Sequence, residues 1–231
     1  MEYNGKMSLA AARVRALCFD VDGTLSDSDD YYVAQIAAHM KRLRVVPHPQ
    51  RTARRLVMWM ESPGNALLGL ADTLGLDNQL IAAIDWSHRR RRRPGRQLPV
   101  MAGMSEVLTA LHSCFPMAIV SARDEVSTMT FLEQANWRNH FDSIVTALSA
   151  PHTKPYPDPI LLAARQMNTS PASCLMIGDT TVDVRAGKAA GAQTVAVLCG
   201  YGEEDELRRA GADLILSKTA DLREVLLDQM P

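Results

Sequence analysis

The segment Ala16-Leu-Cys-Phe-Asp-Val-Asp-Gly-Thr-Leu-Ser-Asp27 decides the fold, because it joins an apolar run directly to a group of acids. Residues 16–19 have the pattern of a strand buried on both faces. Asp20 and Asp22 follow it at i and i+2, so both project into one crevice, and Gly23 permits a sharp turn beside them. Crowded carboxylates need a compensating charge, most simply a divalent cation. The segment therefore predicts a metal-dependent site, with a polar Asp-Gly turn as the alternative.

Composition narrows the classes of protein that the chain can represent. Its 231 residues can bury a full core and still carry an insert. The net charge of -1 argues against broad binding of nucleic acid or an anionic membrane. No apolar run reaches spanning length, and the first residues lack a signal-peptide core. Cys18, Cys174 and Cys199 fall in expected strands and Cys114 at an expected helix end, so we interpret all four as reduced core residues. These observations predict a cytoplasmic protein without a membrane partner, and they leave its oligomeric state open.

The pattern of apolar residues changes twice along the chain. Between residues 28 and 95 it has helical spacing with no strand, which predicts a separate all-helical domain. From Leu98 onward strands and helices alternate, as in a parallel sheet covered by helices on both faces. We expect strands at 117–121, 143–147, 174–178, 194–198 and 214–216, and helices at 125–135, 158–167, 182–190, 203–210 and 222–229. The predicted fold is α/β: a Rossmann-like parallel-sheet core from residues 1–27 and 96–231, with the first strand central and the helical domain of residues 28–95 inserted.

Two later segments supply hydrogen-bond donors and a positive charge that could hold an anionic ligand. An apolar strand ends in Ser121, whose hydroxyl and the following backbone N–H groups are suitable donors; the alternative is that Ser121 caps the next helix. Thr153-Lys-Pro-Tyr-Pro-Asp-Pro159 is stiffened by proline, and Lys154 can enter the crevice as a fixed positive charge. Alone, Lys154 would be interpreted as an exposed loop lysine. We expect Asp158 to cap the helix that Pro159 begins.

A second pair of acids follows a later strand. Leu175-Met-Ile-Gly-Asp-Thr-Thr-Val-Asp183 places Asp179 at a strand end and Asp183 on the first turn of the next helix. Both are expected to face the same crevice, where open parallel sheets bind ligands. Acids also suit a helix start through the helix dipole, which is the structural alternative for Asp183.

These four motifs, in this order, resemble those of the haloacid dehalogenase superfamily of phosphatases and phosphomutases. The resemblance covers the chain outside the insert, and the insert matches the helical cap of phosphoglycolate phosphatase-like and β-phosphoglucomutase-like members. An acid at Asp22 is typical of members that transfer phosphoryl groups. Two departures are Ala122, where many relatives carry Asn, and Thr153, where many carry Gly.

The resemblance implies a reaction and a cofactor. Asp20 would attack phosphorus to form an aspartyl-phosphate, and Asp22 would protonate the leaving alcohol and later deprotonate water. The implied ligands of Mg²⁺ are Asp20, the backbone carbonyl of Asp22, Asp179, and Asp183 through water. The groups implied to bind the phosphoryl oxygens are Ser121, Ala122 and Lys154, with backbone amides at Gly23 and Thr24.

The sequence leaves the substrate open beyond a small phosphorylated metabolite. The resemblance favours phosphate-monoester hydrolysis like that of phosphoglycolate phosphatase, with a β-phosphoglucomutase-like mutase as the alternative. The run Arg89–Arg93 raises a different class, a polyanion-binding surface, although a solvated helix end is the simpler interpretation. A regulatory module that has lost turnover is a further alternative.

Overall fold

The computed structural model describes residues 9–27 and 99–227 of the chain. Two compact units are distinguished, residues 1–29 with 99–231 and residues 30–98. The predicted helical cap at 28–95 and the run Arg89–Arg93 lie outside the described residues, so both stay predictions. The two described stretches of chain meet at Asp27 and Pro99, because Asp27 N donates a hydrogen bond to Pro99 O at 3.0 Å. In the described parts of the chain, no helix has the length and apolar character needed to cross a membrane.

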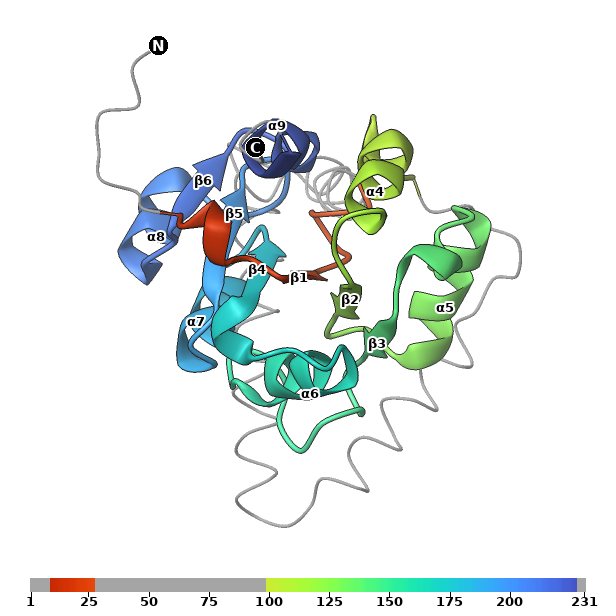
Figure 1. Cartoon of the computed structure of the whole chain (residues 1–231), viewed down its shortest axis with the longest axis horizontal. Helices are drawn as coiled ribbons and strands as arrows, with labels where there is room; N and C mark the ends of the chain where they lie inside the picture. Colours follow the sequence, from red (N-terminus) through yellow and green to blue (C-terminus); the bar gives the residue numbers. More distant parts are fainter. Residues whose placement is uncertain (1–8, 28–98, 228–231) are drawn as a thin grey trace, which may run out of the picture. The chain divides into compact units, whose positions relative to one another are not determined.

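A six-stranded sheet forms the centre of the first unit, with every neighbouring pair of strands parallel (Figure 1). The strand order is β3-β2-β1-β4-β5-β6. The strands are β1 (Ala16–Phe19), β2 (Met117–Val120), β3 (Ser143–Val145), β4 (Cys174–Gly178), β5 (Gln193–Val197) and β6 (Leu214–Leu216). The predicted Rossmann-like α/β core is confirmed, and β1 lies inside the sheet between β2 and β4 as expected.

Helices connect successive strands and cover the sheet. Figure 1 shows α4 and α9 together on one side of it and α6 and α7 on the other. The α-helices are α4 (Met104–His112), α5 (Glu125–Gln134), α6 (Asp158–Gln166), α7 (Thr181–Ala189), α8 (Glu204–Ala210) and α9 (Leu222–Leu227). Short 3₁₀ turns are η1 (Ala11–Arg13), η2 (Arg138–His140), η3 (Pro171–Ser173) and η4 (Thr219–Asp221). The expected strands and helices agree with these bounds to within one or two residues, which is the range in which helix ends fray.

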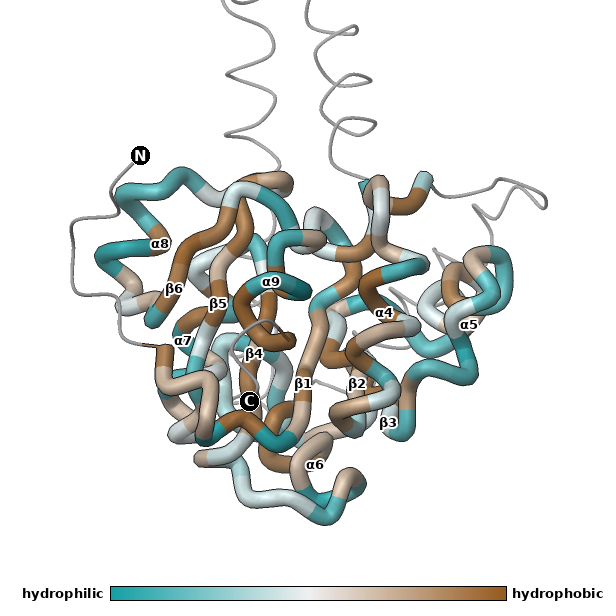
Figure 2. The backbone as a smooth tube through the Cα atoms, turned by 45° about the horizontal axis from the view of Figure 1, so that its top comes forward, coloured by the Kyte–Doolittle hydropathy of each residue, from teal (hydrophilic) through white to brown (hydrophobic). Residues whose placement is uncertain are grey.

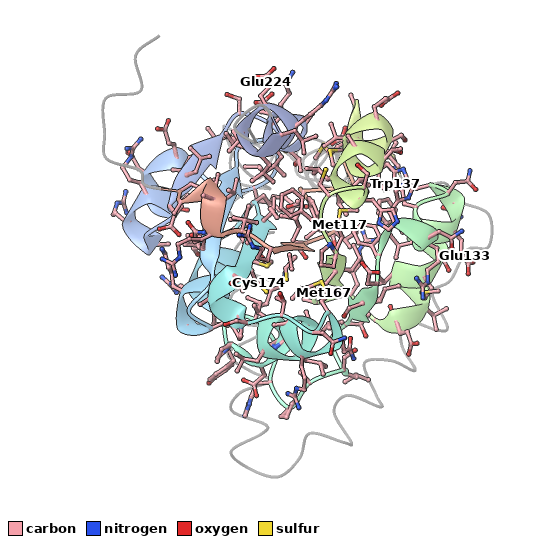
Figure 3. The ribbon with its side chains drawn as sticks, in the orientation of Figure 1. Met117, Glu133, Trp137, Met167, Cys174 and Glu224 are labelled. Atoms are coloured by element: carbon pink, nitrogen blue, oxygen red, sulfur yellow. The ribbon has the colours of Figure 1, made fainter. Side chains whose placement is uncertain are left out.

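The buried core explains why the sequences of the strands are continuous runs of apolar residues. All residues of β1, β2 and β4 are buried, because helices pack on both faces of the sheet. Figure 2 shows the hydrophobic colour along the strands and the hydrophilic colour over α8. In Figure 3, Met117, Met167 and Cys174 lie inside the ribbon, whereas Glu133 and Glu224 lie on its outer side. The strand ends are therefore the places where polar side chains can gather beside a dry core.

The expectations for three single residues are wrong. Cys114 is exposed beyond the end of α4, and Cys199 is half-buried in the turn after β5, so only Cys18 and Cys174 are buried strand residues. Asp158 is the first residue of α6 and not its cap, because Pro157 occupies the N-cap position. Its carboxylate instead contacts Nδ1 of His152 at 3.3 Å.

Candidate active site

Three acids converge at one edge of the sheet. Asp20 follows β1 and Asp179 follows β4, and these two strands pair in parallel with Phe19 opposite Ile177. Asp183 reaches the same place from the first turn of α7. One carboxylate oxygen from each of the three acids lies within 4.8 Å of the others, and all three residues are buried. This arrangement matches the expectation from the strand-end motifs and provides an all-oxygen site of the kind that hard cations prefer.

Lys154 is the cation that compensates this cluster. Its Nζ donates to Oδ1 of Asp20 at 2.8 Å and to Oδ1 of Asp183 at 2.6 Å. Burial would by itself lower the pKa of Lys154, but the carboxylates of Asp183 and Asp20 outweigh it and raise that pKa above its ordinary value. Lys154 is therefore a permanently charged, buried group, and the interpretation as an exposed loop lysine is wrong.

Asp20 experiences opposing influences. Burial raises its pKa, Lys154 lowers it, and the neighbouring charges of Asp183 and Asp22 raise it, with a net value of about 7 in the absence of a metal. Lys154 holds Oδ1, while no described residue donates a hydrogen bond to Oδ2. Asp20 thus has one carboxylate oxygen fixed by Lys154 and one that accepts no hydrogen bond from a described residue.

Asp183 is held by its own helix as well as by the lysine. Its Oδ2 accepts hydrogen bonds from Thr180 N at 3.1 Å and from Thr180 Oγ1 at 2.7 Å. The first of these gives the backbone N–H of the N-cap residue of α7 a partner. A side chain at Gly178 would collide with the Asp183 carboxylate, so the glycine makes room for it. Both the structural alternative and the crevice-facing expectation for Asp183 are therefore fulfilled by different oxygens of one carboxylate.

Asp179 is fixed by the loop that follows β5. Its Oδ2 accepts a hydrogen bond from Tyr201 N at 2.8 Å, and a Cβ at Gly200 would collide with the same carboxylate. Thr24 Oγ1 lies 3.4 Å from Oδ1 of Asp179, and Thr24 O accepts from Thr219 Oγ1 at 2.7 Å. The glycines flanking Tyr201 are the sequence signal for this close approach.

The predicted phosphoryl-binding groups lie on the neighbouring strand end and turn. Ser121 follows β2, which pairs with β1, and its Oγ accepts a hydrogen bond from Arg123 N at 3.2 Å. The cap of α5 is Asp124, whose carboxylate accepts from Ser127 N at 3.0 Å, so Ser121 is not the helix cap. Ala122 occupies the turn after Ser121, while Gly23 turns with a φ of 69°.

Asp22 has a partner that sequence reasoning missed. Arg123 Nε donates to Oδ2 of Asp22 at 2.5 Å, and Nη2 of Arg123 forms an ion pair with Oδ1. The two residues are 101 positions apart, and the interval between them includes the whole insert. Only the position of Arg123, just beyond the strand that ends before Ser121, was a signal in the sequence, since it places the backbone of Arg123 near the same edge of the sheet.

Comparison with known proteins agrees with this geometry. The family described as haloacid dehalogenase-like hydrolase matches residues 17–197. An N-acetylmuramic acid 6-phosphate phosphatase of Pseudomonas putida is 27% identical, over 93% of this chain and 96% of its own length. A phosphoglycolate phosphatase of Xanthomonas campestris pv. campestris is 29% identical, over 94% of this chain and 93% of its own.

Solved structures agree as well. A putative haloacid dehalogenase-like hydrolase from Bacteroides fragilis has a TM-score of 0.69 and 25% identity, covering 90% of this chain and 99% of its own. A putative β-phosphoglucomutase from Bacteroides vulgatus has a TM-score of 0.66 and 25% identity, covering 91% of this chain and 86% of its own. The match to the family spans most of the chain and includes the strand ends that bear Asp20, Ser121 and Asp179. The chain therefore belongs to the haloacid dehalogenase-like hydrolases.

Proposed function

We propose that the protein is a Mg²⁺-dependent phosphatase that hydrolyses a small phosphate monoester through an aspartyl-phosphate on Asp20. The observation that carries this proposal is the buried contact between Asp20 and Lys154 beside two further acids. A carboxylate with one oxygen held by a cation and the other without a hydrogen-bond donor among the described residues is suited to nucleophilic attack. The names of the relatives, which are phosphatases, support the same reaction.

The two half-reactions use Asp20 and Asp22 in turn. In the first, an oxygen of Asp20 bonds to phosphorus, the phosphorus–ester bond breaks, and Asp22 gives its proton to the leaving alkoxide. In the second, water attacks phosphorus, the bond to Asp20 breaks, and Asp22 takes the proton of the water. Lys154, Ser121 and the backbone amides around Gly23 stabilise the equatorial oxygens in both transition states.

The acid cluster fits a divalent cation. The proposed ligands are Asp20, the backbone carbonyl of Asp22 and Asp179, with Asp183 acting through water because its oxygens already serve Lys154 and Thr180. Magnesium prefers such oxygen ligands and keeps part of its water shell. When bound, the cation supplies charge that offsets the repulsion between a phosphate dianion and the carboxylates.

The substrate and the setting belong to the proposal too. We expect a small phosphorylated metabolite, hydrolysed in the cytoplasm, with the predicted cap at 28–95 choosing the leaving group. The relatives named above act, by their names, on phosphoglycolate and on N-acetylmuramic acid 6-phosphate. A mutase activity is the second candidate, favoured by the structural likeness to a putative β-phosphoglucomutase.

Phosphate release with and without metal tests the function. We expect the purified protein to release inorganic phosphate from short phosphate monoesters with Mg²⁺ and to lose this activity in excess chelator. Activity that survives chelation would contradict the metal requirement. Conversion of a hexose 1-phosphate to its 6-phosphate in place of phosphate release would identify the mutase instead.

The raised pKa of Asp20 predicts how metal-free protein responds to pH. The folded protein keeps a proton on Asp20 up to a pKa of about 7, whereas the unfolded chain loses it near the ordinary pKa of 3.8, so stability falls as pH rises between them. Since a cation binds the ionised carboxylate, Mg²⁺ should raise the melting temperature more at about pH 8 than at about pH 5. Calorimetry with Mg²⁺ or chelator measures both shifts. Equal shifts at the two pH values would contradict the prediction.

A further inference from the structure

Arg123 is held in place more firmly than a surface arginine. Its guanidinium engages both carboxylate oxygens of Asp22, and its Cζ lies 5.9 Å from the ring centroid of buried Phe131. Its backbone N donates to Ser121 Oγ, and its backbone O accepts from Ala147 N at 2.9 Å. The side chains of Arg123 and Asp22 are only 14% and 28% exposed. A forked cation is thus fixed at the rim of the site.

This ion pair conflicts with the role of Asp22 in the proposed function, which is to donate a proton to the leaving group. To act on the leaving group, a carboxyl oxygen of Asp22 has to contact the ester oxygen. In the structure both of its oxygens face the guanidinium, which stays charged at every accessible pH. Separating a partly buried pair of this kind is costly unless each partner finds a new one.

The position of Arg123 indicates where a replacement anion would come from. Asp22 acts at the leaving group, so the guanidinium that contacts it lies on that side of the phosphoryl site. Lys154 is committed to Asp20 and Asp183, on the side of the nucleophile. An anion carried by the leaving group would therefore meet Arg123 and not Lys154.

We propose that Arg123 recognises a carboxylate on the leaving group, so that the preferred substrate is the phosphate ester of a short hydroxy acid. This inference rests on the proposed phosphatase function. The substrate carboxylate takes the place of the Asp22 carboxylate in the same planar fork, so the guanidinium exchanges one carboxylate partner for another. Binding of such a substrate releases Asp22 toward the ester oxygen, which couples recognition to catalysis.

Two esters that differ in a single group test this inference. In 2-phosphoglycolate the leaving group ends in a carboxylate, and in 2-hydroxyethyl phosphate it ends in a neutral hydroxymethyl group of similar size. With the full chain and Mg²⁺, we expect kcat/KM to favour phosphoglycolate by about 10- to 100-fold, the range typical of a hydrogen bond to a charged group. Because release of Asp22 is part of the effect, kcat should differ as well as KM.

Variants at Arg123 assign the preference to this residue. Arg123→Gln should bring the two kcat/KM values to within about threefold of each other, since neutral Gln cannot pair with a carboxylate. Arg123→Lys keeps the charge without the fork and should give an intermediate ratio, which also serves if the Gln variant folds poorly. The ratio cancels any change in the freedom of Asp22 that affects both esters alike. Arg165→Gln, on the exposed face of α6, is the matched control and should keep the wild-type ratio.

The possible outcomes distinguish a failure of the Arg123 proposal from a failure of the proposed phosphatase function. Equal hydrolysis of both esters by the wild-type protein, or a preference that survives in both Arg123 variants, would overturn the role of Arg123 and leave the phosphatase function standing. No Mg²⁺-dependent release from either ester or from p-nitrophenyl phosphate would contradict the phosphatase function, and the inference with it.

Discussion

Replacing Asp20 with Asn should abolish phosphate release while the protein stays folded. The amide has nearly the same shape, and its oxygen can still accept the hydrogen bond that Lys154 Nζ donates at 2.8 Å. It lacks the anionic oxygen needed to bond to phosphorus, so no aspartyl-phosphate can form. Loss of a nucleophile of this kind lowers kcat on the order of 10⁴- to 10⁶-fold. Phosphate release from a short ester at saturating Mg²⁺ measures the loss.

Two further measurements make that result specific. Asp27→Asn introduces the same chemical change seven residues along the same segment, outside the acid cluster, and should keep its activity. The amide that replaces the Asp20 carboxylate carries no charge to bury, so the variant should melt at or above the temperature of metal-free wild type at about pH 8. An Asp20→Asn protein that turns over at the wild-type rate would refute the assignment of the nucleophile.

The parts of this site that could be predicted from sequence are those that the backbone fixes. Asp20 and Asp179 sit one residue past buried strands, and parallel strands that pair must end at the same edge of the sheet. Lys154 was placed in the same crevice by the resemblance of the ordered motifs to those of the family. A one-residue error in a strand boundary would not have moved these acids to another edge, so the prediction tolerated the uncertainty of element ends.

The interactions that prediction missed depend on side-chain direction and on contacts between distant segments. Nothing in the local sequence of Arg123 indicates that its guanidinium turns toward Asp22, because an arginine after a strand can equally well extend into solvent. The two roles of Asp183 were interpreted as alternatives, since sequence spacing cannot show that a carboxylate serves a helix start with one oxygen and a lysine with the other. The capping of α6 was misjudged for a similar reason: Asp158 pairs with His152 in the preceding loop.

Replacing Lys154 with Met should impair both catalysis and stability. The substitution keeps much of the apolar stem but leaves the carboxylates of Asp20 and Asp183 facing each other in a buried site without their cation. Removing one partner from a buried ion pair costs about 3–5 kcal/mol, because the remaining charge is uncompensated. The loss of a charge that stabilises the phosphoryl oxygens should lower kcat at least about 10²- to 10³-fold. Urea unfolding in chelator and phosphate release with Mg²⁺ measure the two effects.

Lys188 offers a matched comparison, because it also pairs with an aspartate but near the surface. Its Nζ contacts Oδ1 of Asp213 at 2.5 Å, with 38% of the lysine side chain exposed compared with 5% for Lys154. Exposed pairs contribute at most about 1 kcal/mol, so Lys188→Met should unfold at nearly the wild-type urea concentration and keep its activity. If the two variants lost equal stability, burial of the Lys154 pair would not be the cause. If Lys154→Met kept the wild-type kcat, its charge would have no part in binding the phosphoryl group, and Ser121 with the backbone amides would have to supply the stabilisation alone.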